Sequence, residues 1–486
     1  MLRIFKHLLA VGILIIGSSL PAFSQSLARE IGAEYFSAMR DEGATVLIGS
    51  ETESVKSVEW RDISIISASG AKVHMAFVRA TEIGDGRVSM TYPEILRSTR
   101  TTESGGRIFD RIITQKNLKH IVSGEAGARR YEFGTDYTSL KMANNTPKFE
   151  MEILFHDTLS SSTISGGALN GTIGTGSGGK VEVSYALTIN NTVHNGQLTF
   201  DSFDFEFEME DFGERNAEEY IRGGSELLLS IALGKGKHTV AVNQPNFSGI
   251  FSSSSENSVF GVSLQNGQFR LDAFVRKSRI GIHFSDLPLL PMQASLNSWR
   301  MAFEMPLSKS DTATPLLAEI NLDRLIASDT VWGLIDPGSI LPRDAASLNL
   351  DTTMSMRWLI DTFDLEDTEK LSALRLIDKE PVVIESITVR EVSLEVAGAL
   401  LQGQAFLDVK PNQSEAVGTA EFSLKGGVGL LDKLVEIGLV ELEQSKMAKM
   451  FSGMFALPGG DGEDHLVTKV DLKEGGSIFV NGQQIK

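Results

Sequence analysis

The sequence contains no cysteine. An exported form of the chain can therefore neither be stabilised by disulfides nor be anchored through a lipid-modified N-terminal cysteine. Packing must supply its stability instead. A chain that needs no disulfide in an oxidising compartment is more typical of the bacterial periplasm than of a eukaryotic secretory route.

A long apolar run is missing too. The most apolar stretch, residues 8–16, has about half of the ~20 residues that a membrane-spanning helix needs. It follows Arg3 and Lys6 and precedes small residues at 21–24, the pattern of a cleavable leader. We expect residues 1–24 to be a signal peptide, and the mature protein to be periplasmic with no transmembrane span.

Basic stretches are also lacking. The chain has 45 Lys and Arg against 63 Asp and Glu, a formal net charge of -18, and loss of Arg3 and Lys6 with the leader lowers it to about -20. Such a charge repels nucleic-acid phosphates and anionic lipid headgroups. Nucleic acid is therefore excluded as the expected partner.

Motifs for chemistry are equally scarce. The sequence has no Gly-x-Ser-x-Gly elbow, phosphate-binding loop or calcium-loop pattern, and histidines such as His74 and His194 lack zinc-ligand spacing. Residues 174–179 have the glycine spacing of a dinucleotide site, but a strand follows where that site needs a helix. We predict no catalytic, cofactor-binding or metal-binding residue, and no enzyme; the ligand-binding residues stay unknown.

Two flexible or acidic segments have structural interpretations. The Ser, Gly and Thr of residues 160–179 are typical of a mobile loop. The acidic run Asp361 to Glu369 has no central glycine that would shape a cation loop, so it is interpreted as a solvated helix start.

Apolar and polar residues alternate over much of the chain, which predicts strands with one buried face. The clearest strand is 181–189. Asn195-Gly196 predicts a turn after it, and a Phe-rich strand follows at 198–209, whose phase slip at Ser202 predicts a bulge. Asp85-Gly86 and Asn266-Gly267 predict tight turns.

Helical spacing is confined to a few places. It predicts helices at 27–39, at 214–233 with a break at Gly223-Gly224, and a pair near 428–456. The Met-rich stretch 447–454 is interpreted as core packing against the sheet. Contact with a membrane surface through the neighbouring Lys446 and Lys449 is the alternative, which nearby acidic residues weaken.

The expected fold class is β-dominated, all-β to α+β, with elongated, curled antiparallel sheets, a few helices and an apolar groove. We expect an N-terminal β-rich region at 25–250 and a C-terminal β-rich region at 251–486, the latter carrying the helical pair.

Several motifs, in order over residues 285–486, give the chain a family resemblance. They are Trp-Gly-Leu-Ile-Asp-Pro at 332–337, Leu-Pro-Arg-Asp at 341–344, Leu-Leu-Asp-Lys-Leu at 430–434, the Met and Phe residues of 450–458, and Asn-Gly-Gln at 481–483. With them the chain resembles the exported bacterial family called domain of unknown function 2125. The resemblance implies no activity, and its Asp336-Pro337 and Pro342-Arg343-Asp344 segments are interpreted as structural corners. Ala345 and Ala346 depart from the proline expected after Asp344.

A Phe-rich strand face and a Met-rich tail favour a binding or carrier protein for an apolar ligand such as a lipid. The alternative is a non-catalytic envelope scaffold whose apolar faces meet in a closed core. An enzyme with an unrecognised site is a third hypothesis. Alternation along one strand cannot separate a groove from a core, and the oligomeric state stays open.

Overall fold

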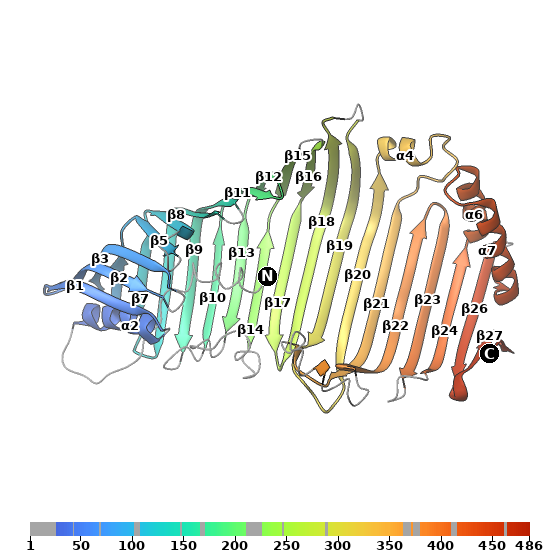
Figure 1. Ribbon diagram of the computed structural model, residues 1–486. Coiled ribbons are helices and arrows are strands. Elements are labelled where there is room, and N and C mark those ends of the chain that lie inside the picture. Colours follow the sequence, from blue (N-terminus) through green and yellow to red (C-terminus); the bar gives the residue numbers. More distant parts are fainter. Residues whose placement is uncertain are drawn as a thin grey trace. The chain divides into compact units, whose positions relative to one another are not determined.

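The computed structural model describes residues 26–486, except 42, 68–69, 102–106, 146–147, 166–170, 210–225, 245–246, 287–289, 363–370, 373–379, 410–415 and 461–463 (Figure 1). The chain forms two compact units, Met1–Ile250 and Phe251–Lys486. The expected signal peptide, most of the acidic run 361–369 and the first part of the expected helix 214–233 lie outside the described residues.

Unit 1 opens with one helix, α2 (Leu27–Asp41), and continues in strands. The strands are β1 (Thr45–Glu53), β2 (Ser57–Ile66), β3 (Lys72–Gly84), β4 (Arg87–Thr91), β5 (Ile95–Thr101), β6 (Arg107–Lys116), β7 (Lys119–Ser123), β8 (Ala128–Asn145), β9 (Lys148–Ser165), β10 (Thr172–Gly178), β11 (Val181–Ile189), β12 (Thr192–Phe200), β13 (Phe203–Met209), β14 (Leu227–Leu233) and β15 (Gly236–Gln244). β16 (Phe247–Ser255) runs across the boundary between the units.

The helix α2 closes the first part of unit 1. Ile31, Tyr35 and Met39 recur at helical spacing and are buried against β1 to β4, together with Trp60 and Ile63. The helix predicted at 27–39 is therefore confirmed. The strands around this core pair in a closed ring, in the order β3, β4, β7, β8, β6, β5 and back to β3.

The second part of unit 1 is a forked sheet. The first half of β9 pairs with β11, and its second half pairs with β10. Asp157, which lies between the halves, has a left-handed φ of 51°. One branch continues through β11, β12 and β15, and the other through β10, β13 and β14.

Four local predictions in this region are wrong: the loop at 160–179, the helix over 227–233, the turn at Asn195-Gly196 and the bulge at Ser202. Residues 160–179 are not a loop where described, because Ser160–Ser165 belong to β9 and Thr172–Gly178 form β10. Residues 227–233 are strand β14 rather than helix. Asn195-Gly196 is no turn, because it lies inside β12, paired with Ala186 and Tyr185.

The turn between β11 and β12 is instead formed by Asn190 and Asn191, whose φ angles of 47° and 65° are both left-handed. Asparagine tolerates this region better than most residues, which fits a type I′ hairpin turn. Ser202 is a corner rather than a bulge, since β12 pairs with β15 while β13 pairs with β10 and β14.

Unit 2 consists of strands and three α-helices in its described part. The elements are β17 (Asn257–Gln265), β18 (Gln268–Phe284), β19 (Met292–Pro306), β20 (Thr314–Ala327), α4 (Asp329–Ile335), β21 (Ala346–Trp358), β22 (Val382–Val396), β23 (Ala399–Val409), β24 (Ala416–Lys425), α6 (Gly427–Glu436), α7 (Leu442–Phe455), β25 (Leu457–Pro458), β26 (His465–Lys473), a 3-10 turn (Glu474–Gly476), β27 (Ser477–Val480) and β28 (Gln483–Gln484).

The strands β17 to β24 pair with their sequence neighbours, and β26 follows β24, so unit 2 is an antiparallel meander. The predicted turn Asn266-Gly267 is confirmed by left-handed φ angles at both residues, as is Asp85-Gly86 in unit 1. The helical pair predicted near 428–456 is confirmed as α6 and α7. The β-dominated, antiparallel fold class is correct.

Candidate functional site: the apolar sheet faces

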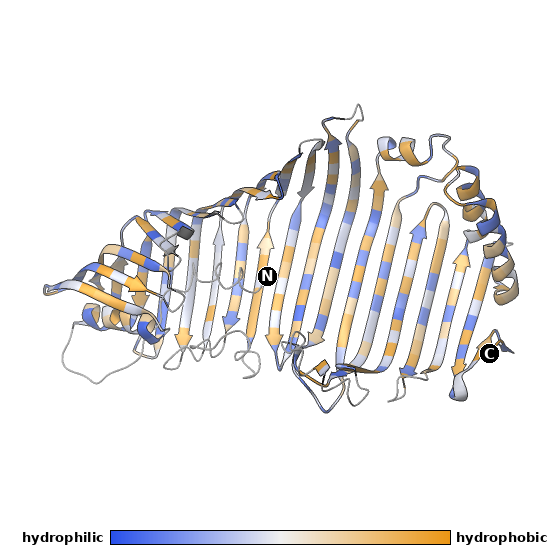
Figure 2. Ribbon diagram, in the orientation of Figure 1, coloured by the Kyte–Doolittle hydropathy of each residue, from blue (hydrophilic) through white to orange (hydrophobic). Residues whose placement is uncertain are grey.

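One face of the unit 2 sheet is apolar across seven strands. Residues that pair directly in an antiparallel sheet point to the same face. One row of such pairs is Trp299, Leu322, Leu348, Leu394, Leu401, Leu424 and Leu466. A second is Leu316, Met354, Ile387, Leu407, Gly418, Leu472 and Ile478. We call this surface the unit 2 apolar face; Figure 2 shows the alternation along these strands that produces it.

The opposite face of the same strands is charged. Arg300 donates to Asp272 at 2.8 Å, and Arg270 contacts both Asp272 and Glu304. Partial burial opposes ionisation of Asp272, but the two guanidinium groups outweigh it and hold the pKa of Asp272 below its usual value. Arg390 pairs with Asp351 on the same face. The two faces therefore belong to different environments.

The unit 2 apolar face is not covered by the described residues. All members of the two rows are half-buried or exposed, with Leu394 38% exposed. Met301 and Phe422, which lie between the rows, are 41% and 39% exposed. The helix α4 contacts the sheet mainly at β19, and α6 mainly at β23. At ~4.8 Å per strand, the seven intervals from β19, where the first row begins, to β27, where the second row ends, make this face ~34 Å long.

Unit 1 has an apolar inner face of its own, between the branches of the forked sheet. Leu140, Ile153, Val181 and Phe203 are buried there. The rings of Phe155 and Phe203 meet edge to face at 5.6 Å. Here two layers face each other, so the apolar face is largely closed.

A glycine ladder shapes one wall of that inner face. Gly174, Gly176 and Gly178 of β10 pair with Phe207, Phe205 and Phe203 of β13. An added Cβ at each glycine would lie 2.3 to 2.4 Å from the partner's ring. The glycines therefore give room for rings stacked at 6.3 and 6.2 Å, and the spacing that resembled a nucleotide motif serves packing.

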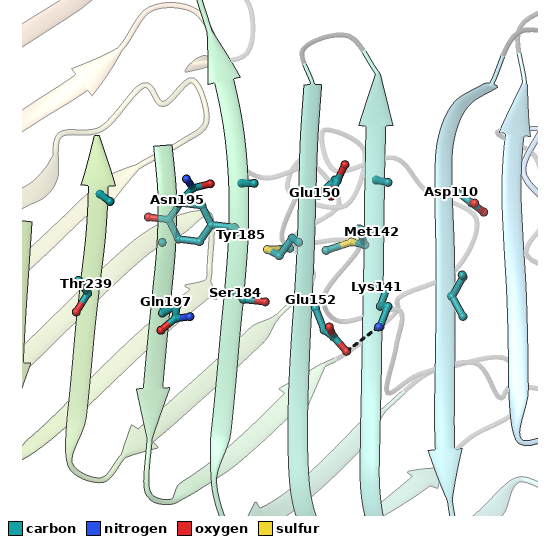
Figure 3. Close-up of a pocket in the computed structure, with 16 residues that line it drawn as sticks. Asp110, Lys141, Met142, Glu150, Glu152, Ser184, Tyr185, Asn195, Gln197 and Thr239 are labelled. Atoms are coloured by element: carbon teal, nitrogen blue, oxygen red, sulfur yellow. Dashed lines mark ion pairs between the residues drawn. The ribbon is translucent and has the colours of Figure 1, made fainter. Parts of the chain in front are cut away.

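The outer face of this region carries a depression of about 700 Å³ (Figure 3). Two rows of paired residues line it, from Asp110 on β6 to Thr239 on β15. Glu152 is bridged by Lys141 at 3.3 Å and accepts a hydrogen bond from Ser139 at 2.9 Å. Acids, amides and hydroxyls can hydrogen-bond a polar molecule here, and Ile112 and three alanines lie between them. Sequence reasoning missed this site because it misplaced the turn that sets the pairing of β11 and β12.

The described residues show no metal centre: no three His, Asp or Glu side chains among them could hold an ion together. His74 lies exposed near Ser64, and His194 is half-buried on β12. Asp361 accepts the Lys309 N–H at 2.7 Å. None of the helices in the described part of the chain has the length and apolarity needed to cross a membrane.

The Met-rich stretch contradicts its prediction. Met447, Met450, Phe451 and Met454 of α7 are each more than half exposed, so they do not pack into a core. The buried residue of α7 is Ser445. The small polar side of the helix faces the protein and its apolar side faces outward, which periodicity alone could not reveal.

The first two motifs of the family resemblance, at 332–337 and 341–344, form the end of α4 and a corner after it. Asp336 is buried and accepts the backbone N–H groups of Ile340 at 3.0 Å and Leu341 at 2.8 Å. Burial opposes its ionisation, yet these donors keep the pKa of Asp336 below its usual value. Arg343 lies over the Trp332 ring at 5.8 Å. The interpretation as a structural corner is confirmed.

The sequence matches no protein-family model and no curated protein.

Proposed function

We propose that this protein is an exported, non-catalytic carrier that holds an apolar ligand such as a lipid on the unit 2 apolar face. The observation that supports this most directly is the combination of a seven-strand apolar face with the half-exposed state of its side chains. The leader-like residues 1–24 support a periplasmic location. The resemblance to the domain of unknown function 2125 family belongs to the same proposal.

The free energy available on this face is substantial. A Leu or Ile that passes from about a quarter exposed to buried removes ~40 Å² from water, or ~1 kcal/mol at ~25 cal/mol per Å². The burial free energy of two such rows together exceeds the entropic cost of ordering one acyl chain. The rows run across the strands for ~34 Å, so an extended acyl chain can contact apolar side chains along its whole length.

A non-catalytic envelope scaffold is the second candidate, because the same face is large enough for a protein. An area of ~34 by ~20 Å approaches the ~800 Å² that each partner contributes to a standard interface. In that case a folded partner, rather than a lipid, covers the rows.

The first test is to purify the protein natively and analyse its organic-solvent extract by mass spectrometry. The carrier proposal predicts stoichiometric lipid. A lipid-free protein that nevertheless copurifies with a stoichiometric partner protein would support the scaffold instead.

A second test locates the ligand. Trp299 lies in the first apolar row, so a spin-labelled fatty acid should quench its fluorescence. Trp358 follows Met354 on the same face of β21, so both variants carry Trp358→Phe. In that background Trp299→Phe should remove most of the quenching, whereas the matched Trp332→Phe on α4 should not. Equal quenching in both variants would place the ligand elsewhere and contradict the site.

A further inference from the structure

The helix α7 is inverted with respect to an ordinary surface helix. At 100° per residue, Met447, Met450, Phe451 and Met454 share one side, and each is more than half exposed. The opposite side carries the buried Ser445 and the half-buried Lys449 and Ser452. We call the four exposed residues the α7 stripe. Turning the helix by half a turn would bury them, so their exposure indicates an apolar contact outside the fold.

The stripe stands beside the end of the unit 2 apolar face. The chain leaves α7 through β25, whose Pro458 pairs with Leu466 of the first apolar row. The C-terminal end of α7 is also held by Asn481, whose Nδ2 donates to the Phe455 carbonyl at 2.9 Å. Figure 1 shows α6 and α7 beside β24 and β26. Leu439 and Leu457, just outside the helix, are also more than half exposed.

The charges around the stripe indicate what kind of surface it contacts. Lys446 pairs with Glu443 at 3.0 Å, and Lys449 pairs with Asp432 of α6. Both lysines beside the stripe are thus paired with acidic residues of the helical pair, so they offer no free positive charge to an anionic bilayer, and the whole chain has a net charge of -18. A neutral, flexible surface of Met and Phe fits a zwitterionic lipid surface, whereas an anionic bilayer would be repelled.

We infer that the α7 stripe docks the protein on a zwitterionic lipid bilayer and brings the end of the unit 2 apolar face to the membrane surface, where lipid enters or leaves it. The docking stands on the geometry of α7, and the lipid transfer rests on the proposed function. Because the stripe lies along one short helix, its contact with a bilayer is shallow and reversible.

The test is flotation of the purified full-length protein with phosphatidylcholine vesicles at physiological salt. The double variant Met450→Glu, Phe451→Glu should bind these vesicles about tenfold less than the unchanged protein. Ala448→Glu adds a charge to an exposed position of the same helix outside the stripe, and should bind as the unchanged protein does. Circular dichroism should show the same fold in all three proteins, since every changed side chain is solvent-exposed.

Two results would overturn the inference. One is equal vesicle binding by the double variant and the unchanged protein, or no vesicle binding by either. The other is a dimer in sedimentation velocity that the double variant dissolves, which would assign the stripe to a second copy of the chain. Lipid extraction of the same samples separates the two proposals: lipid-loaded protein without vesicle binding refutes only docking, and lipid-free protein that binds vesicles refutes only the carrier.

Discussion

Units 1 and 2 bury the apolar faces of their strands to different extents. In unit 1, apolar faces are covered, either by α2 or by the second branch of the forked sheet, and both buried apolar clusters found among the described residues lie there. In unit 2, strands with equal alternation form a single layer whose apolar rows remain half-exposed. Alternation therefore predicts that a strand has an apolar face. Whether the fold buries that face depends on the presence of a second layer.

The difference has an energetic meaning. Buried clusters stabilise unit 1 internally, and their side chains have little left to gain from a ligand. The half-exposed rows of unit 2 can still release burial free energy when a ligand or partner covers them. The charged face of unit 2, with the ion pairs around Asp272, keeps the other side of the layer in water.

The largest expected effect comes from matched Phe truncations. Phe36 is buried in edge-to-face contact with Trp60, at 5.3 Å between ring centroids. Phe36→Ala should lower the free energy of unfolding of unit 1 by about 3–5 kcal/mol, because a cavity remains. Phe422→Ala, on the open face, should cost about 1 kcal/mol or less in ligand-free protein. Urea unfolding measures both, and equal losses would show that the open face is in fact a core.

The next largest expected effect is a loss of unit 1 stability at acidic pH. His120 is buried in unit 1, its Nδ1 2.9 Å from the Tyr92 hydroxyl, and burial lowers the pKa of His120 to about 3. Because this folded-state pKa lies below the unfolded value of about 6.5, the contribution to stability is full above pH ~6.5 and declines toward pH ~3. By pH 5 unit 1 should lose about 2 kcal/mol through this group.

The control for that series is His120→Gln, which cannot titrate. Its unfolding midpoint in urea should change less between pH 7 and pH 5 than that of the unchanged protein. Parallel pH profiles in the two proteins would mean that His120 does not set the acid sensitivity of unit 1.

A smaller effect tests the glycine ladder that closes the inner face of unit 1. Gly176→Ala places a Cβ 2.4 Å from the Phe205 ring, so the ring must shift. We expect a loss of about 1–3 kcal/mol in thermal or urea unfolding. Adding Phe205→Ala should reduce the extra cost of the alanine at 176, since the two residues are coupled. Gly333→Ala on α4, with no atom within 4 Å of the new Cβ, should be nearly neutral.

The sequence by itself determined the class of fold and many of its strands and turns. The strand at 181–189, the helix at 27–39 and the helical pair are found at the predicted places because their signals are local: period two, period 3.6, and residues that tolerate left-handed φ. The predicted turns at 85–86 and 266–267 are correct for the same reason.

Tertiary structure decided the rest. The glycines of β10 looked like a loop because their partner rings are about 30 residues away in the sequence, and Asn195-Gly196 looked like a turn although Tyr185 covers that glycine. The Met residues of α7 looked like core because periodicity shows that a helix has an apolar side but not which way it faces. Whether an apolar face is covered depends on the position of a second layer, and that is a property of the assembled chain rather than of any one strand.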